Sequence, residues 1–200
     1  LAHKNGLKNV FVSNGFITEE AIDVISPFLD AVNIDLKGFS DEYYKNVCGA
    51  RLEPILNAIR HYYRHGIWLE LTTLIVPGHM DSEEKLEEIA DFIYSLDPGV
   101  PWHISRFFPH YKMEHVAATD FSVIEKAVSI GKKRGLKYIY AGNVAGNPYQ
   151  STTCPHCERI VIDRQGYSIK SRNLKGNRCG FCHEKIDIIP DEQISTSLRS

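Results

Sequence analysis

The sequence predicts an α/β fold of parallel strands, followed by a small C-terminal module. Two observations support this prediction: five strand-like segments alternate with helix-like segments over residues 1–146, and two Cys-x-x-Cys pairs follow them. Such alternation produces a parallel sheet with right-handed crossovers. A barrel and an open doubly wound sheet both fit, although no Gly-x-Gly-x-x-Gly follows a strand, which disfavours a dinucleotide fold.

Composition is that of a globular protein. The 200 residues are 43% hydrophobic, which is enough to form a sizeable core. The net charge of −2 gives no indication of nucleic-acid binding or of an acidic tail. No apolar run approaches the ~20 residues of a membrane helix, and no signal peptide is visible. We therefore expect a cytoplasmic protein that does not enter membranes.

The strand and helix segments can be placed one by one. Strands are predicted over residues 7–15, 31–38, 67–78, 101–109 and 136–142. Helices are predicted over residues 19–29, 53–66, 81–96 and 121–135, with a short helix after Ser40. Thr18 and Ser40 are expected N-caps. The expected buried positions are Ile55, Leu56, Ile59 and Tyr63 on one helix and Leu86, Ile89, Ala90 and Ile93 on the next.

Polar residues gather on one side of the predicted strands, near their C-terminal ends. Because side chains alternate along a strand, residues two apart share a face. The residues concerned are Asn33, Asp35, Lys37, Glu70, Thr72, His103 and Ser105, with Ser13, Asn14 and Asn143 at strand ends. A barrel interior that is only a core holds branched apolar residues instead. The pattern therefore predicts a binding site.

The Asp35-x-Lys37 pair has three interpretations. It could be a salt bridge at a strand end, a Schiff-base lysine as in barrel aldolases, or a clamp for the two charges of a zwitterion. Glu70 is a candidate either to contact a substrate or to pair with Lys37. Loop residues expected at the mouth of a barrel add weaker substrate-contact candidates, which are Arg106, His110 and Tyr111.

The C-terminal module, predicted over residues 147–192, carries four metal-binding thiols. Two knuckles separated by 21 residues contain Cys154, Cys157, Cys179 and Cys182. This spacing predicts a closed tetrahedral zinc site of the zinc-ribbon type, with rubredoxin-like iron as the alternative. The spacer is expected to form a hairpin turning at Gln165-Gly166. We expect that His156 and His183 do not bind the metal and that residues 193–200 form a flexible tail.

The same module is basic. Residues 154–185 hold seven Lys or Arg against three acidic residues, a balance of +4. An accessory module that binds a protein or RNA through this basic ribbon is therefore an alternative function. Ordinary solvated hairpin charge also explains the excess, and we favour that explanation.

Several segments together resemble a known family. They are VFVSNGF, VNIDLKGFSDEYYKNVCG, LTTLIVPGHMDSEEKLEEIADFI, PWHISRFFPHYKM and GLKYIYAGNVAG, followed by the terminal knuckles. In this order they resemble radical S-adenosylmethionine (SAM) proteins similar to the pyruvate formate-lyase activating enzyme, and most closely the AmmeMemoRadiSam-system radical SAM enzymes. The resemblance covers almost all of residues 1–190.

The resemblance implies a partial (β/α)6 barrel and places site residues. The family's Asp-x-Lys, which contacts the methionine part of SAM, falls on Asp35 and Lys37, and its Thr-Asn-Gly falls on Ser13, Asn14 and Gly15. A histidine near the SAM ribose falls on His103. Asn33 and Thr72 complete the candidate SAM contacts, although Thr72 replaces an arginine of the activating enzyme. Val12 replaces an acid that helps bind a monovalent cation there, so no such cation site is expected.

The resemblance also implies what lies outside this sequence. The family binds a [4Fe–4S] cluster through Cys-x-x-x-Cys-x-x-Cys, which is not present here, so no residue of this chain is expected to ligate the cluster. With Leu1 as the first residue, we expect a C-terminal fragment of a longer enzyme. That enzyme would cleave SAM reductively and abstract hydrogen from an unknown substrate, for which a protein is one candidate. Memo-like and AMMECR-like proteins are candidate partners.

Overall fold

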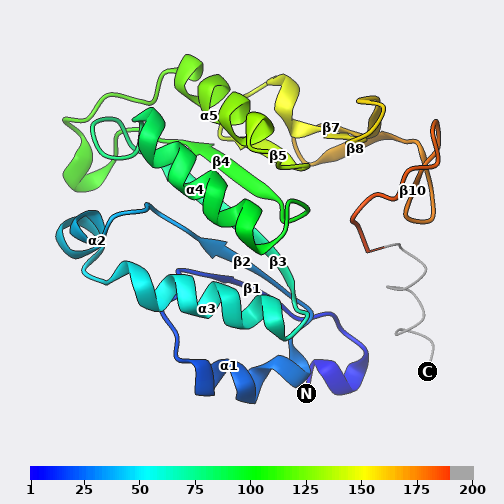
Figure 1. Ribbon diagram of the computed structural model, residues 1–200, viewed down its shortest axis with the longest axis horizontal. Helices are drawn as coiled ribbons and strands as arrows, with labels where there is room; N and C mark the ends of the chain where they lie inside the picture. The colour runs from blue at the N-terminus through cyan, green and yellow to red at the C-terminus, as the bar shows by residue number, and fades with distance from the viewer. Residues whose placement is uncertain (190–200) are drawn as a thin grey trace. The chain divides into compact units, whose positions relative to one another are not determined.

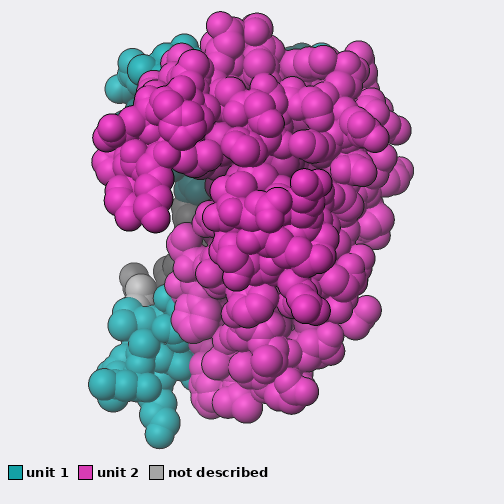
Figure 2. All heavy atoms as spheres, turned by 90° about the vertical axis from the view of Figure 1, so that its left-hand side faces the viewer, with its two compact units in different colours: residues 1–9, 145–200 teal, residues 10–144 magenta. Residues whose placement is uncertain are grey.

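A computed structural model describes residues 1–189 (Figure 1). The chain forms two compact units, one of residues 10–144 and one that combines residues 1–9 with the chain from residue 145 onward (Figure 2). The predicted tail, 193–200, lies outside the described residues. Among the described residues, no helix is both long and apolar enough to cross a membrane.

Residues 10–144 contain one sheet of five parallel strands in the order β1-β2-β3-β4-β5. The strands are β1 (Val10–Ser13), β2 (Ala31–Asp35), β3 (Trp68–Ile75), β4 (Trp102–Arg106) and β5 (Ile139–Gly142). A doubly wound sheet reverses its strand order at a switch point, and this sheet has no reversal. The predicted α/β class is confirmed, and the strand order is that of a barrel segment.

Helices connect successive strands, as the sequence predicts. They are α1 (Glu19–Ile25), α2 (Asp41–Tyr43), α3 (Leu52–Arg64), α4 (Glu83–Leu96) and α5 (Phe121–Lys133), with the 3-10 helices η2 (Ser26–Phe28) and η4 (Tyr111–Met113) and the π-helix η3 (Tyr44–Cys48). A further 3-10 helix, η1 (His3–Asn5), precedes β1. The hydroxyls of Thr18 and Ser40 accept backbone hydrogen bonds from Ala21 and Tyr43, which confirms both predicted caps.

The buried sides of α3 and α4 were predicted with one error. All four expected positions of α4 are fully buried. On α3, Tyr62 is 1% exposed, whereas Tyr63 is 38% exposed and donates a hydrogen bond to Asp97. Adjacent residues on a helix differ by 100° in direction, and Tyr62 continues the i, i+3 series from Ile59 toward the sheet.

The two faces of the sheet differ in burial. On β2 and β3 every second residue is buried, including Val32, Ile34, Leu69 and Leu71. α3 and α5 pack against the strands (Figure 1). Fully burying one such aliphatic side chain contributes about 1.5–3 kcal/mol. The alternate residues, which are mainly polar, lie half-buried on the opposite face, and this face carries the candidate site.

The second unit is built of short antiparallel strands. β7 (Ile160–Gln165) pairs with β6 (Thr152–Thr153) and β8 (Ser168–Arg172), while β9 (Leu174–Lys175) pairs with β10 (Arg178–Cys179). A further turn, η5 (Pro148–Gln150), precedes β6. The predicted hairpin is present, but its turn is Gly166-Tyr167 rather than Gln165-Gly166, because Gln165 still pairs with Ser168. Gly166 adopts a φ of 57°, which a glycine tolerates without strain.

Candidate functional site

A row of polar side chains crosses the open face of the sheet. The parallel register places Asp35 opposite Thr72, Thr72 opposite His103, and His103 opposite Tyr140. Asn33 and Glu70 lie opposite each other, two residues before Asp35 and Thr72 on the same strands, and form a second row on this face. Adjacent strands are about 4.8 Å apart, so Asp35 and His103 are separated by about 10 Å across the sheet. The structure thus brings the predicted SAM contacts of β2, β3 and β4 onto one face.

Asp35 and Lys37 form an ion pair at the end of β2. Lys37 Nζ donates to Asp35 Oδ2 at 2.9 Å, and the two side chains are 34% and 40% exposed, Asp35 being the less exposed. The pair therefore presents one negative and one positive group to solvent on the same face. Each charge is the partner of the other in this structure.

A buried tyrosine and a glycine fix the backbone at this strand end. The backbone N–H of Lys37 donates to the hydroxyl of Tyr44 at 3.0 Å, and burial raises the pKa of that hydroxyl. Gly38 follows, and a Cβ there would lie 2.7 Å from Tyr43 and 2.9 Å from the sulfur of Met80. Close packing thus explains why glycine follows Asp-x-Lys.

Glu70 and His103 form the other charged centre of the face. His103 Nε2 lies 2.8 Å from Glu70 Oε2, and Trp68 Nε1 donates to Glu70 Oε1 at 3.1 Å. Burial raises the pKa of Glu70, but hydrogen bonds from its polar neighbours outweigh burial and hold the pKa below its ordinary value. The alternative in which Glu70 pairs with Lys37 is wrong.

Two further contacts complete the face. Thr72 donates a hydrogen bond of 2.7 Å to Asn33 Oδ1. The ring of Tyr140 stacks on His103 with centroids 5.1 Å apart and 23° between the planes. Tyr140 is not among the site residues predicted from the sequence, because its place beside His103 follows from the register of β4 and β5, which only the structure gives.

Ser13 and Asn14 stabilise a turn beyond β1. Ser13 Oγ accepts from the N–H of Gly15 at 3.1 Å, and Asn14 Oδ1 accepts from the N–H of Phe16 at 3.0 Å. Gly15 has a φ of 72°, and a Cβ there would lie 2.8 Å from Ile34. In this conformation both polar side chains support the backbone at the rim of the site.

The weaker candidates in the loops have structural contacts. Arg106 Nε donates to the carbonyl of Thr119 at 2.7 Å, and Asn143 Nδ2 donates to the carbonyl of Arg106 at 3.1 Å. Tyr111 is 72% exposed with a φ of 52°. Arg106 and Asn143 thus connect the segments that follow β4 and β5, whereas His110 and Tyr111 are exposed.

The four cysteines of the second unit converge. The Sγ atoms of Cys154 and Cys182 lie 3.6 Å apart, those of Cys157 and Cys179 lie 3.7 Å apart, and all four lie within 4.8 Å of one another. Zinc–sulfur bonds of about 2.3 Å at tetrahedral angles place sulfur atoms about 3.8 Å apart. The cluster therefore has the dimensions of a site for one ion.

Both knuckles share one backbone geometry. The residue after the second cysteine of each pair, Glu158 or His183, has a φ near 60° and donates its N–H to the carbonyl of the first cysteine. Phe181 donates its N–H to Cys179 Sγ at 3.4 Å. Burial raises the pKa of Cys179, but hydrogen bonds from N–H groups and from the neighbouring thiols outweigh burial and lower it to about 6. A backbone hydrogen bond lowers the pKa of Cys182, but burial and the neighbouring thiols outweigh it and raise that pKa to about 12.

Part of the basic charge of this unit has internal partners. Arg159 lies over the ring of Phe181 at 4.9 Å, Arg164 donates to Thr152 at 2.6 Å, and Arg178 donates to the carbonyl of His183 at 3.1 Å. These contacts agree with the interpretation that the excess positive charge is ordinary surface charge of the hairpin.

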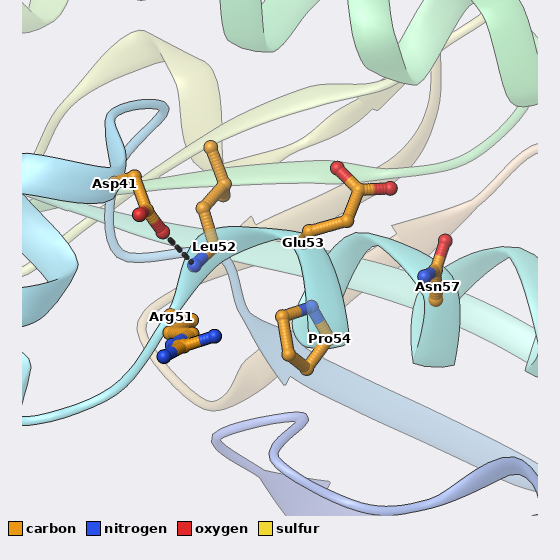
Figure 3. Close-up of a pocket in the computed structure, with 6 residues that line it drawn as sticks. All are labelled: Asp41, Arg51, Leu52, Glu53, Pro54 and Asn57. Atoms are coloured by element: carbon orange, nitrogen blue, oxygen red, sulfur yellow. Dashed lines mark hydrogen bonds between the residues drawn. The ribbon is translucent and has the colours of Figure 1, made fainter.

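A separate pocket of about 520 Å³ opens at the start of α3 (Figure 3). Its lining residues are Asp41, Arg51, Leu52, Glu53, Pro54 and Asn57. Asp41 accepts a hydrogen bond of 3.1 Å from the N–H of Leu52, which joins α2 to α3. The pocket shares no lining residue with the polar row.

Comparisons with known sequences identify relatives of the chain. The Radical SAM superfamily model matches residues 1–93. An uncharacterized protein of Methanocaldococcus jannaschii is 41% identical over 192 residues, covering 94% of this chain and 57% of that protein. The pyruvate formate-lyase 1-activating enzyme of Escherichia coli is 24% identical over 91 residues, covering 44% of this chain and 37% of the enzyme. The chain thus spans about half the length of the curated relatives it matches.

Solved structures share the fold. A domain of pyruvate-formate lyase-activating enzyme from Bacteroides vulgatus superposes with a TM-score of 0.60 at 20% identity, over 70% of this chain and 84% of that domain. Streptococcus suis SuiB, in a structure with bound S-adenosylmethionine, gives a TM-score of 0.57 at 9% identity, over 72% and 35% of the two chains. The chain is thus similar in sequence to Radical SAM superfamily proteins over residues 1–93 and shares the fold of the solved structures.

Proposed function

We propose that this chain forms part of a radical SAM enzyme and that the open face of its sheet binds SAM. The observation that carries the proposal is the polar row: an acid–base pair at the end of β2 and a carboxylate–imidazole pair on β3 and β4, about 10 Å apart across one face. A zwitterionic ligand with a nucleoside at its other end matches these two centres in charge and order.

The methionine end of SAM would bind at Asp35 and Lys37. Its ammonium group would pair with the Asp35 carboxylate and its carboxylate with Lys37 Nζ, so that ligand contacts replace the present 2.9 Å ion pair. Because both partners are already charged and ordered on the strand end, little rearrangement is required. Asn33 and Thr72, which are hydrogen-bonded to each other, would line the floor between the two ends.

The nucleoside end would lie at His103. Glu70 accepts from its imidazole and fixes the ring, while Tyr140 stacks on its other side. A ring held from two sides offers a defined hydrogen-bonding edge to a ribose or a base. Ser13 and Asn14 would shape the rim through the turn at Gly15.

Membership of the radical SAM superfamily would imply a [4Fe–4S] cluster as well as SAM. When bound, the cluster would supply the electron for reductive cleavage of SAM, by which the whole enzyme would abstract hydrogen from its substrate, while Asp35, Lys37 and His103 of this chain would hold SAM. This chain contains five cysteines, four of them at the spacing of a single ion and the fifth, Cys48, alone. We therefore place the cluster ligands outside this sequence, and we propose that the role of this chain is to bind and orient SAM.

We assign the four-cysteine site to zinc, since the sulfur spacing fits one closed tetrahedral ion, with a single iron as the alternative. An AmmeMemoRadiSam-type enzyme with Memo-like or AMMECR-like partners is the more specific proposal. A Schiff base on Lys37 is disfavoured because Lys37 Nζ is held in an ion pair with Asp35 at 2.9 Å and is part exposed, whereas a nucleophilic lysine is usually desolvated in an apolar pocket.

Calorimetric titration with SAM tests the proposal. Lys37→Ala is expected to weaken SAM binding roughly 10- to 100-fold, since one charged hydrogen bond contributes about 1.5–3 kcal/mol. Lys45→Ala is the matched control, because Lys45 pairs with Asp41 on the surface at 2.6 Å, outside the polar row. Equal SAM affinity of the two variants would exclude the clamp.

A further inference from the structure

Three metal-binding side chains meet on the helices of residues 10–144, outside the polar row. His61 and His65 are four residues apart at the C-terminal end of α3, so they lie one turn apart on the same side of the helix. Asp23 comes from α1, which packs against α3. His61 Nε2 and His65 Nε2 lie 2.6 and 2.9 Å from the same oxygen of Asp23, and 3.3 Å from each other.

These distances are close to those between ligands of one metal ion. Imidazole nitrogen and carboxylate oxygen bind late transition ions at about 2.0–2.2 Å, so two ligands lie about 2.9 Å apart at a right angle and about 3.3 Å apart at the tetrahedral angle. Two of the three observed separations fall at these values. Only the 2.6 Å contact between Asp23 and His61 must open by a few tenths of an ångström.

The surroundings of His61 favour a metal-binding imidazole. Its Nδ1 atom is buried and, among the described residues, has no hydrogen bond, but Glu19 Oε2 lies 3.4 Å away. When a metal replaces the contact between His61 Nε2 and Asp23, a carboxylate behind the ring would favour the tautomer with the proton on Nδ1 and leave the lone pair of Nε2 for the metal. The C-terminal end of α3 adds a partial negative charge that favours a cation.

We propose that Asp23, His61 and His65 bind a divalent late first-row transition ion of the zinc, nickel or copper class, with Glu19 orienting His61. Two imidazoles and one carboxylate suit these ions, whereas magnesium and calcium prefer oxygen ligands throughout. Asp23 and His65 are 55% and 32% exposed, so water completes the coordination. The bound ion ties α1 to α3, and the site is independent of the four cysteines and of SAM.

The test uses the whole chain with the cysteine site first loaded with zinc. Calorimetric titration with Ni²⁺ is expected to show one further ion per chain, without release of the bound zinc. His65→Gln is expected to abolish this binding, and Glu19→Gln to weaken it roughly 10- to 100-fold, as loss of an outer carboxylate usually does. His115→Gln is the matched control, because His115 is exposed and outside the cluster, and it is expected to bind Ni²⁺ normally.

A second readout is independent of folding defects at the end of α3. Ni²⁺ is paramagnetic, so NMR signals from α1 and the last turn of α3 are expected to broaden in the wild type and to stay sharp in Asp23→Asn. Nickel affinity that is equal in the wild type and His65→Gln would overturn the proposal. Broadening confined to residues 145–189, or no second ion at all, would overturn it as well.

Discussion

The hydroxyl of Thr119 links the ends of β3 and β4 inside the protein. Thr119 is fully buried, and its Oγ1 donates to the carbonyl of Ile75 at 2.6 Å and accepts from the N–H of Phe107 at 3.0 Å. Thr119→Val keeps the shape of the side chain but leaves a buried donor and a buried acceptor without this partner. Each such group costs about 1–3 kcal/mol, and since the two are neighbours their costs do not simply add, so we expect a loss of about 2–4 kcal/mol.

Urea unfolding followed by tryptophan fluorescence measures this loss. Both tryptophans, Trp68 and Trp102, lie in strands of residues 10–144, so their emission reports on the unit that contains Thr119. The expected loss lowers the midpoint by roughly 1–2 M urea. Thr119→Ser keeps the hydroxyl and loses one methyl group, so we expect it to lower the free energy of unfolding by only about 1 kcal/mol. If the serine variant were less stable than the valine variant, the reasoning from buried hydrogen bonds would be refuted.

The remaining predictions concern three other sites. Glu70→Gln is expected to be less stable than the wild type by about 1–2 kcal/mol at neutral pH. Because the folded pKa of Glu70 is lowered, this stability difference is present above the unfolded pKa of about 4.3 and is lost as the pH falls from there through the folded pKa. Urea unfolding at pH 7 and at pH 3.5 measures the change in this difference. Cys179→Ser is expected to lose the thiolate-bound metal by elemental analysis, whereas Cys48→Ser keeps it; equal metal content would contradict the four-cysteine site. Gly38→Ala is expected to cost about 1–3 kcal/mol by overpacking against Tyr43, measurable as a lowered Tm; an unchanged Tm would contradict this packing.

Strand and helix order could be predicted from the sequence because hydrophobic periodicity and capping are local properties. Thr18, Ser40 and the buried positions of α4 follow from such signals. The choice between a barrel order and a doubly wound sheet could not be made, because strand order is set by which crossovers pack together. The misplaced turn at Gly166 shows the same limit, since strand register rather than local turn preference decided it.

The pairing within the site depends on register, which the sequence does not state. Asn33 lies opposite Glu70, so Lys37, four residues further along, is about 13 Å beyond Glu70 along the strand. Lys37 therefore pairs with Asp35 two residues away, and Glu70 is left to pair diagonally with His103. Alternation predicted which residues share the face, but not which of them touch.

An NMR titration of the chain with SAM tests the central claim most directly. The claim is that the open face of the sheet in residues 10–144 binds SAM between Asp35 and His103. It predicts saturable shifts of backbone signals at the C-terminal ends of β2, β3 and β4, which Lys37→Ala removes or weakens. Saturable shifts confined to the pocket at the start of α3 or to residues 145–189, or no shifts at millimolar SAM, would contradict it.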